Sequence, residues 1–363
     1  MTSFSDLTTL RVGGPIGNLV DATTRDELVA TTLAFWGEPT DWLVLGGGSN
    51  LVVADAGFGG NVVRVANRGI DRATDGVPRI RIEAGETWDA VVAFAVTEGL
   101  AGIEALSGIP GTSGAGPIQN IGAYGQQLSD TLVGIDLLDF DSGEVVTLAP
   151  DELGLGYRTS ALKRGRLGVV LSLELELHDG GGLSDPVAYA QLASALGVEL
   201  GARVPLADAR NAVLALRASK GMVWDPADPD SISAGSFFTN PIVSEGFARA
   251  LPADAPRYPT EPEAAPQVLP LGAEITVPEG PASGEYLVKL SAAWLIEHSG
   301  IQRGFALPGS GAAISAKHTL AIVNRGGATA ADVAQLAGYV QTRVLSEFGV
   351  RLQPEPVLIG VDL

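Results

Sequence analysis

Residues 102–125, GIEALSGIPGTSGAGPIQNIGAYG, are the most unusual stretch of this sequence. Seven of these 24 residues are glycine, and Pro110 and Pro117 fix the backbone angle φ where they stand. Glycine permits positive φ and has no Cβ, so a ligand can approach the backbone closely. Successive amides of such a loop can also bind an anion. A glycine-rich turn is the alternative interpretation, but the stretch is too long and too polar for a turn.

The polar side chains in this stretch carry no charge. Gln119, Asn120 and Tyr124 offer hydrogen-bond donors and acceptors but no carboxylate or thiolate. This set suits a flat heteroaromatic ring or a diphosphate better than a metal ion. We therefore predict an organic cofactor, and no metal, at this loop.

A second glycine-rich segment, LVLGGGSNL at residues 43–51, points to the same kind of ligand. The apolar run 42–45 predicts a strand, and three glycines, Ser49 and Asn50 follow it. Amides at a strand end, with a hydroxyl and a carboxamide beside them, can hold a diphosphate. A Cβ at Gly47 is expected to stand where the diphosphate approaches. The segment is not the G-x-G-x-x-G of a Rossmann turn. Alone it is weak evidence for a diphosphate site, and together with 102–125 it is much stronger.

Composition excludes several classes of function. The 363 residues include 42 acidic and 23 basic ones, for a net charge of −19, which argues against nucleic acid or an anionic membrane as a partner. An anionic substrate must then be met by a few well-placed cations. The chain has no cysteine and three scattered histidines, so disulfides and thiolate metal sites are excluded. We predict neither a signal peptide nor a membrane span, and expect a cytoplasmic protein that is a monomer.

Hydrophobic periodicity predicts mixed strands and helices without regular βαβ alternation, which is an α+β pattern. Thr87 is predicted to cap a helix that Gly99 stops, and Thr329 with Asp332 forms a capping box for a last helix that ends before Gly349. The alternation in 171–177 predicts a strand with one solvent-facing side. The further predicted elements are a helix start at 23–27, strands at 42–45, 61–66, 80–84, 133–139 and 145–148, helices over 189–218 and near 289–299, a turn-rich insert at 224–230, and an irregular proline-rich stretch at 252–281.

Five motifs in a fixed order point to one family: LGGGSNLVV at 45–53, IPGTSGAGPIQNIGAYG at 109–125, GYRTS at 156–160, GSFFTNP at 235–241 and QPEP at 353–356. Together they resemble UDP-N-acetylenolpyruvoylglucosamine reductases, the MurB flavoenzymes of bacterial peptidoglycan synthesis. The resemblance runs from about Thr8 to Gly360. The form PIQNIGAYG resembles the subtype that keeps an extra substrate-covering loop.

The resemblance implies an FAD-binding fold of the vanillyl-alcohol-oxidase (PCMH) type with a C-terminal α+β substrate-binding domain. The expected boundaries are 1–66 and 67–218 for two FAD-binding subdomains and 219–363 for the substrate-binding domain, whose last strand returns to the active site. FAD is expected to be held non-covalently, with NADPH as co-substrate. The expected FAD-binding residues are Gly46, Gly47, Gly48, Ser49, Asn50, Leu51, Ile109, Pro110, Gly111, Thr112, Gly114, Gly116, Pro117, Gln119, Asn120, Gly122, Ala123 and Tyr124.

Three residues match the catalytic positions of the family. Arg158 is expected to bind the enolpyruvyl carboxylate, since a guanidinium is always charged and can bind a carboxylate in a bidentate way. Ser236 is expected to protonate the substrate, and Glu355, between two prolines, to assist. The proline after Glu355 departs from the family, which usually has an apolar residue there. By the same match Tyr157, Tyr189, Lys220, Asn240 and Glu297 are expected to bind the substrate. His298 and His318 match no family position.

The implied reaction is NADPH-dependent reduction of UDP-N-acetylglucosamine enolpyruvate to UDP-N-acetylmuramate. Two alternatives remain open from the sequence. One is an oxidase of the same fold that acts on an alcohol or a sugar, which leaves GSFFTNP and QPEP unexplained. The other is a nucleotide-sugar-binding protein without turnover, against which the intact Arg158, Ser236 and Glu355 argue.

Overall fold

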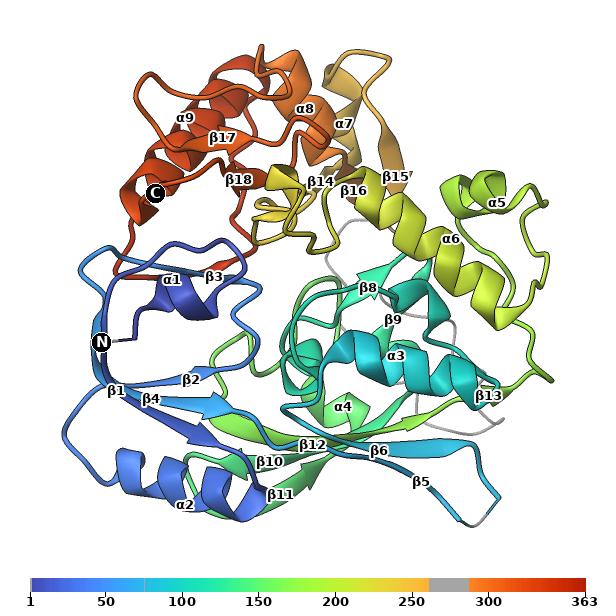
Figure 1. Ribbon diagram of the computed structural model, residues 1–363. Coiled ribbons are helices and arrows are strands. Elements are labelled where there is room, and N and C mark those ends of the chain that lie inside the picture. Colours follow the sequence, from blue (N-terminus) through green and yellow to red (C-terminus); the bar gives the residue numbers. More distant parts are fainter. Residues whose placement is uncertain (1, 75, 261–286) are drawn as a thin grey trace, which may run out of the picture.

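The chain folds into mixed helices and strands, so the predicted α+β class is confirmed (Figure 1). The computed structural model describes residues 2–74, 76–260 and 287–363. Most of the predicted proline-rich stretch 252–281 therefore lies outside the described residues. Two main sheets and a C-terminal group of helices and strands surround the glycine-rich stretch.

The first sheet has the order β1-β4-β2, and its strands pair in parallel. β2 covers Trp42–Leu45, as predicted, and it leads directly into the glycines at 46–48. Thr24 and Glu27 form a capping box at the start of α2, which packs on this sheet. The elements are α1 (Phe4–Leu7), β1 (Ile16–Ala22), α2 (Arg25–Trp36), β2, β3 (Leu51–Val53) and β4 (Phe58–Val65).

The second sheet is antiparallel, with the order β11-β10-β12-β6-β5. The prediction that 171–177 has a solvent-facing side is wrong at Ser172, whose exposed fraction is 1%. Arg25 of α2 and Arg81 both donate hydrogen bonds to the Ser172 hydroxyl and to Asp136, so these side chains cover the polar face. The strands are β5 (Ile70–Arg72), β6 (Arg79–Glu83), β10 (Leu132–Asp139), β11 (Val145–Leu148) and β12 (Gly168–Glu176).

Helix α3 (Trp88–Thr97) leads the chain to the glycine-rich stretch, and it lies on the opposite side of the strands from α2 (Figure 1). Trp88, Val91 and Val92 are buried in the core that the helix shares with the second sheet. Thr87 holds the capping position, but its side chain makes no capping hydrogen bond, contrary to the prediction. Short elements follow: β7 (Leu100–Ala101), η1 (Glu104–Leu106), η2 (Ser113–Ile118), β8 (Gly122–Ala123), β9 (Gln126–Gln127) and η3 (Leu128–Asp130).

The predicted helix over 189–218 is two helices, α5 (Ala190–Leu196) and α6 (Leu206–Ser219). Gly197 and Gly201 adopt φ of 69° and 85°, which ends α5, and Pro205 comes directly before α6. The sequence signals that separate the helices are therefore two glycines and a proline. The neighbouring short elements are α4 (Pro150–Leu153) and β13 (His178–Asp179).

The C-terminal region contains α9 (Ala330–Phe348) with the predicted capping box between Thr329 and Asp332. The predicted helix near 289–299 begins later, at Ala292, because β16 (Leu287–Leu290) belongs to the sheet β14-β16-β15. Its other elements are η4 (Pro229–Ser231), β14 (Ile242–Ser244), α7 (Glu245–Ala250), β15 (Arg257–Pro259), α8 (Ala292–His298), β17 (Ala312–Ile314), β18 (Ile322–Asn324) and β19 (Val357–Ile359).

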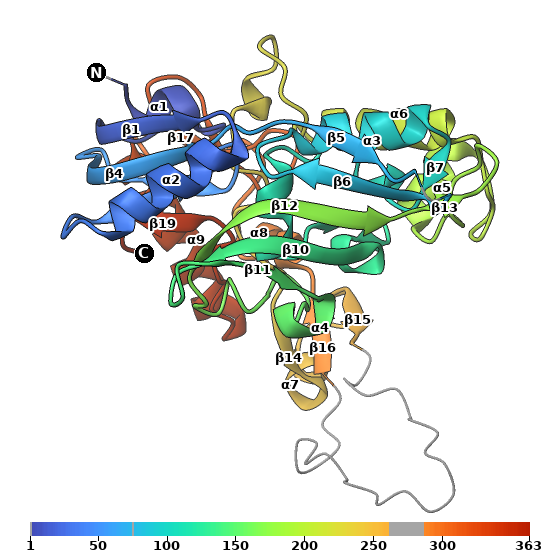
Figure 2. The ribbon, with the colours of Figure 1, turned by 90° about the horizontal axis from the view of Figure 1, so that it is seen from below.

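The last strand returns to the N-terminal part of the molecule. β19 pairs in parallel with β3, so that Val357 lies opposite Leu51. Figure 2 shows the C-terminal elements beside the first sheet, next to β1 and β4. This pairing places the segment 353–356 next to the glycines that follow β2.

The network around Asp136 makes a testable contribution to stability. Burial raises the pKa of Asp136, but hydrogen bonds from Arg25, Arg81 and Thr147 outweigh burial and hold it at about 2, against an ordinary 3.8. This depression corresponds to about 2 kcal/mol. Because the folded-state pKa is lowered, the contribution is present above about pH 4 and is lost as the pH falls towards 2.

We predict that Asp136→Asn lowers the free energy of unfolding at pH 7 by about 2 kcal/mol, with a difference that shrinks below pH 4. Urea unfolding at several pH values measures it. Asp21→Asn, which breaks an exposed ion pair with Arg64, is the control and should cost less than about 1 kcal/mol. A loss in Asp136→Asn that does not change with pH would contradict the electrostatic explanation.

Candidate functional site

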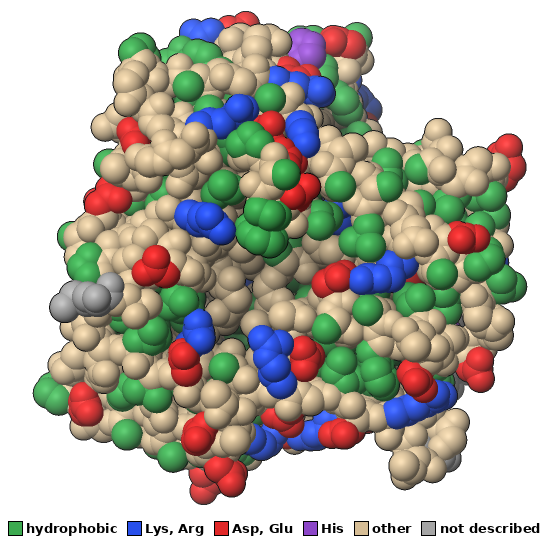
Figure 3. Space-filling view, in the orientation of Figure 1, with side chains coloured by type: hydrophobic (Ala, Val, Ile, Leu, Met, Phe, Trp, Pro, Cys, Tyr) green, Lys and Arg blue, Asp and Glu red, His purple; other side chains and the backbone are tan. Residues whose placement is uncertain are grey.

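A central cavity of about 290 Å³ lies where the two sheets and the C-terminal region meet. Figure 3, in the orientation of Figure 1, shows a hollow in the middle of the visible face of the molecule, with Lys and Arg side chains near its edge. Its walls come from the segment 43–51, the glycine-rich stretch 102–125, the segments around Ser236 and Glu355, and further residues that include Trp88, Arg158 and Arg217. The two glycine-rich segments that the sequence singled out therefore line one cavity.

The two glycine-rich segments pack backbone against backbone. A Cβ added at Gly47 would lie 2.7 Å from the Cα of Gly111, and one at Gly46 would lie 2.6 Å from the hydroxyl of Thr112. At Gly48, where φ is +61°, a Cβ would lie 2.1 Å from the carbonyl oxygen of Leu7. A Cβ at Gly47 would thus clash with the protein itself, and the expectation that it also blocks the diphosphate stays a prediction.

We predict that Gly47→Val lowers the melting temperature as well as the flavin content, because the two segments must separate to admit the side chain. Gly59→Val is the matched control, since a Cβ there meets no atom within 4 Å. Thermal unfolding and the flavin absorbance of both purified variants measure these effects. A Gly47→Val protein of unchanged melting temperature that has lost only its flavin would contradict the packing explanation.

Twelve of the eighteen expected FAD-binding residues line the central cavity: Gly46, Gly47, Gly48, Ser49, Asn50, Leu51, Ile109, Pro110, Thr112, Gly116, Gln119 and Gly122. The other six, which do not line it, are Gly111, Gly114, Pro117, Asn120, Ala123 and Tyr124. Asn120 is buried, has φ of 47°, and holds the loop together through hydrogen bonds with Ser129 and the carbonyl of Gly156.

The lining of the cavity fits a dinucleotide cofactor. Glycines without Cβ atoms bring the backbone to the surface of the cavity, and Ser49, Asn50 and Gln119 add neutral polar groups. Trp88, Ile109 and Leu45 supply apolar surface for an aromatic ring. No group of three or more potential metal ligands occurs in the described part of the chain.

Arg158 reaches into the central cavity from a strained backbone position. Its φ is 52°, which is unusual for a residue with a Cβ. Its guanidinium donates hydrogen bonds to the carbonyl oxygens of Asn120, at 3.2 Å, and Gly122, at 2.8 Å. Its Nε lies 3.5 Å from Oε1 of Glu355. These contacts fix a cation in the wall that faces the glycine-rich stretch.

Glu355 is largely buried, and burial raises the pKa of its carboxyl group, while Arg158 and Lys163 act in the opposite direction. Gln119 donates a hydrogen bond to its Oε1 at 3.3 Å, and Asn50 bonds both Gln119 and the backbone carbonyl of Glu355. A network of neutral and cationic groups therefore positions a carboxyl group whose proton affinity is increased. Such a group holds its proton more tightly than an exposed glutamate does, and it can take part in proton transfer.

Ser236 is half-buried in the central cavity and is coupled to Glu355 through the backbone. The next residue, Phe237, donates its amide to Leu320 and accepts the amide of Glu355 at 2.9 Å. The Ser236 hydroxyl has no hydrogen-bond partner within the described ranges, so it is available to a ligand.

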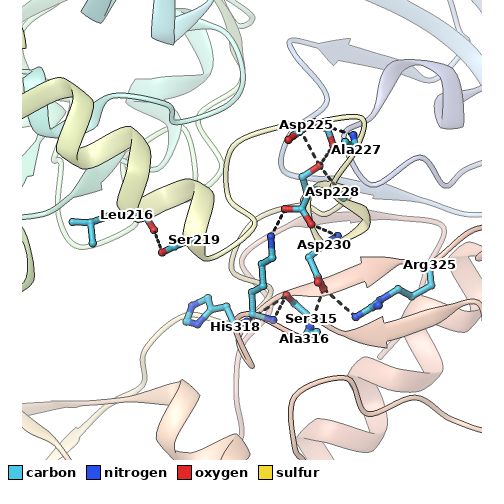
Figure 4. A network of polar contacts seen from close by, with 12 residues as sticks. Leu216, Ser219, Asp225, Ala227, Asp228, Asp230, Ser315, Ala316, His318 and Arg325 are labelled. Carbon is cyan, nitrogen blue, oxygen red and sulfur yellow. Dashed lines mark hydrogen bonds and ion pairs between the residues drawn. The ribbon is translucent and has the colours of Figure 1, made fainter. Parts of the chain in front are cut away.

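The segment before Ser236 is held to the C-terminal region by two carboxylates (Figure 4). Asp228 forms an ion pair with Lys317 at 2.7 Å. Asp230 accepts hydrogen bonds from the backbone of Ala316, at 2.8 Å, and from Arg325, at 3.1 Å. The turn-rich insert at 224–230 thus anchors the chain shortly before it enters the cavity.

The five expected substrate-binding residues lie outside the central cavity. Tyr189 packs edge-on against Tyr124 with ring centroids 5.6 Å apart, and the Lys220 ammonium lies 5.4 Å from the Tyr124 ring. Tyr157 lies next to Arg158, and the ammonium of Lys289 is 4.9 Å from its ring.

The remaining two expected residues belong to the C-terminal region. The amide oxygen of Asn240 accepts the backbone N–H of Ala292 at the start of α8. Glu297 accepts a hydrogen bond from Thr319. His318 stays neutral, since burial and the cations Lys220 and Arg303 lower its pKa to about 4 despite Glu297 nearby.

The cavity wall also contains Trp88, Lys163, Arg217 and Met222, which the sequence analysis did not assign to a site. Lys163 donates to the carbonyl of Glu355 at 3.3 Å. Arg217 lies in the last turn of α6, three residues before Lys220. That i, i+3 spacing, which puts two cations on one helix face, was the signal available in the sequence.

Comparisons with known proteins agree with this geometry. The FAD binding domain family matches residues 17–149, and the C-terminal domain of UDP-N-acetylenolpyruvoylglucosamine reductase matches residues 227–359. Fold and cavity together define an FAD-dependent oxidoreductase. More specifically, the chain belongs to the UDP-N-acetylenolpyruvoylglucosamine reductase (MurB) family.

The relatives match over nearly their whole length. The reductase of Leifsonia xyli is 61% identical over 99% of both chains, and that of Saccharopolyspora erythraea is 51% identical over 98% of this chain and 94% of the relative. The crystal structure of the Thermus caldophilus enzyme aligns with a TM-score of 0.63 at 26% identity, covering 99% of this chain and 97% of that one. Among the described residues, no helix is both long and apolar enough to span a membrane.

Proposed function

We propose that this chain reduces UDP-N-acetylglucosamine enolpyruvate to UDP-N-acetylmuramate, with NADPH as the reductant and FAD held non-covalently in the central cavity. The observation that carries the proposal is the meeting of Arg158, Ser236 and Glu355, from three separate motifs, in the wall of one glycine-lined cavity. An oxidase of the same fold would have no evident use for this triplet. We also keep the division at 1–66, 67–218 and 219–363 as a proposal.

The bound FAD would supply the hydride chemistry between NADPH and the enolpyruvyl double bond, and the cavity residues of 43–51 and 102–125 would hold it. The protein's task is to orient the substrate and to stabilise the charge that develops on it. No histidine is among the described residues that line the cavity, and the chain has no cysteine, which supports non-covalent binding of the flavin.

Arg158 would bind the carboxylate of the enolpyruvyl group and stabilise the enolate-like charge that develops when the hydride arrives. Its fixed orientation favours this role, because two backbone carbonyls already hold the guanidinium in place. Glu355, with its raised pKa, would assist next to that charge. The unpaired hydroxyl of Ser236 would give its proton to C2 of the substrate. Tyr157, Tyr189, Lys220, Asn240 and Glu297 would bind the nucleotide-sugar part.

We predict that Arg158→Lys lowers kcat/KM by at least about 100-fold, because an ammonium cannot reproduce the planar fork or reach both carbonyls. Steady-state kinetics with the enolpyruvyl substrate measures this. The flavin absorbance spectrum is the control for an intact cofactor site. Activity within a few-fold of the unchanged enzyme would remove Arg158 from the carboxylate site.

The role of Ser236 is tested by separating the two half-reactions in stopped-flow experiments. Ser236→Ala should leave the reduction of the flavin by NADPH nearly intact. It should slow reoxidation of the flavin by the enolpyruvyl substrate by about 10²–10⁴-fold, the usual contribution of a positioned acid. Ser236→Cys should recover part of the loss, because a thiol can also donate a proton.

Equal slowing of both half-reactions in Ser236→Ala would mean that the residue supports the flavin site and that the proton comes from elsewhere. Anaerobic bleaching of the flavin by NADPH separates the proposed reductase from an oxidase of the same fold. A flavin that NADPH reduces but that the enolpyruvyl substrate never reoxidises would overturn the proposed reaction.

A further inference from the structure

Arg217 is a cation in the cavity wall to which the proposed mechanism assigns no role. It lies in the last turn of α6 and lines the central cavity together with Trp88 and Met222. A Cβ at Gly108 would lie 2.8 Å from Cδ2 of Leu214 and 3.4 Å from Cδ of Arg217, so this glycine lets α6 pack closely against the glycine-rich stretch. The guanidinium of Arg217 therefore lies at the cavity, close to the glycine-rich stretch.

The hydrogen-bonding groups of Arg217 are mostly unused. Its Nη2 donates to the carbonyl of Met222 at 3.3 Å, and its Nε is buried without any partner within the described part of the chain. A buried N–H without a partner is costly, so such a group calls for an explanation. Arg210, on the same helix, shows the contrast: it binds both carboxylate oxygens of Asp89, at 2.7 and 2.8 Å.

Arg217 also forms no ion pair within the described part of the chain, since the nearby Asp89 is bound by Arg210. Burial lowers the pKa of its guanidinium and Arg158 lowers it further, while Tyr124 and Asp89 act in the opposite direction. An arginine nevertheless remains cationic at neutral pH. Arg158 and Arg217 are thus two like charges in the wall of one cavity, and an anion bound between them would relieve their repulsion.

We infer that Arg217 is a second binding residue for the carboxylate of the enolpyruvyl substrate, acting beside Arg158. This inference rests on the proposed function, which supplies the carboxylate. Its Nε–H and free Nη hydrogens can donate to one carboxylate oxygen while Arg158 serves the other. As charge spreads into the carboxylate after hydride transfer, both guanidinium groups stabilise it.

The test compares two ligands that differ in the carboxylate. UDP-N-acetylmuramate carries it, and UDP-N-acetylglucosamine does not. We expect Arg217→Met to raise the dissociation constant of the first by about 10- to 100-fold, the range for losing charge-assisted hydrogen bonds. The dissociation constant of the second should change by less than about 3-fold. Arg217→Lys, which keeps the charge but not the fork, should lie between the two.

Three further measurements keep the test decisive. Flavin absorbance and thermal unfolding show whether Arg217→Met is folded and holds its cofactor. Arg249→Met, which removes an exposed charge that does not line the cavity, should bind both ligands as the unchanged protein does. The midpoint potential of the bound flavin is measured in parallel, because an arginine that faces the flavin would shift it.

An equal loss for both ligands, or no loss for either, would overturn the inference. A shifted midpoint potential with unchanged binding of UDP-N-acetylmuramate would also overturn it, since Arg217 would then face the cofactor. Failure of the proposed function is recognised separately. In that case the unchanged protein itself would bind UDP-N-acetylmuramate no better than UDP-N-acetylglucosamine.

Discussion

The structure depends on the close approach of two backbones, at Gly46–Gly48 and at Gly111–Thr112. No side chain fits between them, since Cβ atoms at Gly46 and Gly47 would lie 2.6 and 2.7 Å from the opposite segment. This contact joins the end of a strand in the first sheet to the loop that leaves α3. It thereby fixes the position of the cavity relative to both sheets. Glycine serves packing here as much as it serves ligand approach.

Backbone hydrogen bonds position the wall of the cavity that carries Ser236 and Glu355. The carbonyl of Phe237 accepts the amide of Glu355, and β19 continues beside β3, so one set of hydrogen bonds places an acid and a hydroxyl together. Arg158 enters from another loop and is fixed by the carbonyls of the glycine-rich stretch. The chain is strongly acidic, so an anionic ligand must be bound by a few well-placed cations. Such cations lie in the wall of this one cavity.

The sequence predicted those elements whose ends carry a local signal. The strands 42–45 and 145–148 and the helix after Thr329 have the predicted bounds, because glycines or capping residues flank them. The break between α5 and α6 was missed although Gly197, Gly201 and Pro205 mark it, because the apolar pattern was given more weight than the breakers. The burial of Ser172 could not be predicted, since it depends on Arg25, 147 residues away. Arg217 carried one local signal, its i, i+3 spacing to Lys220, but its lack of a carboxylate partner among the described residues is a property of its neighbours in space.

The pairing of β19 with β3 has a consequence for how the molecule is made. Asn50 bonds to the backbone of Glu355, which is 305 residues further along the chain. A ribosome delivers residues in order, so the first sheet can assemble long before the wall that carries Glu355 exists. Such a distant contact forms late, because closing a long loop costs entropy before the contact repays it. The nascent protein therefore passes through a stage in which the glycine-rich segments are already joined while the active centre is still open on one side.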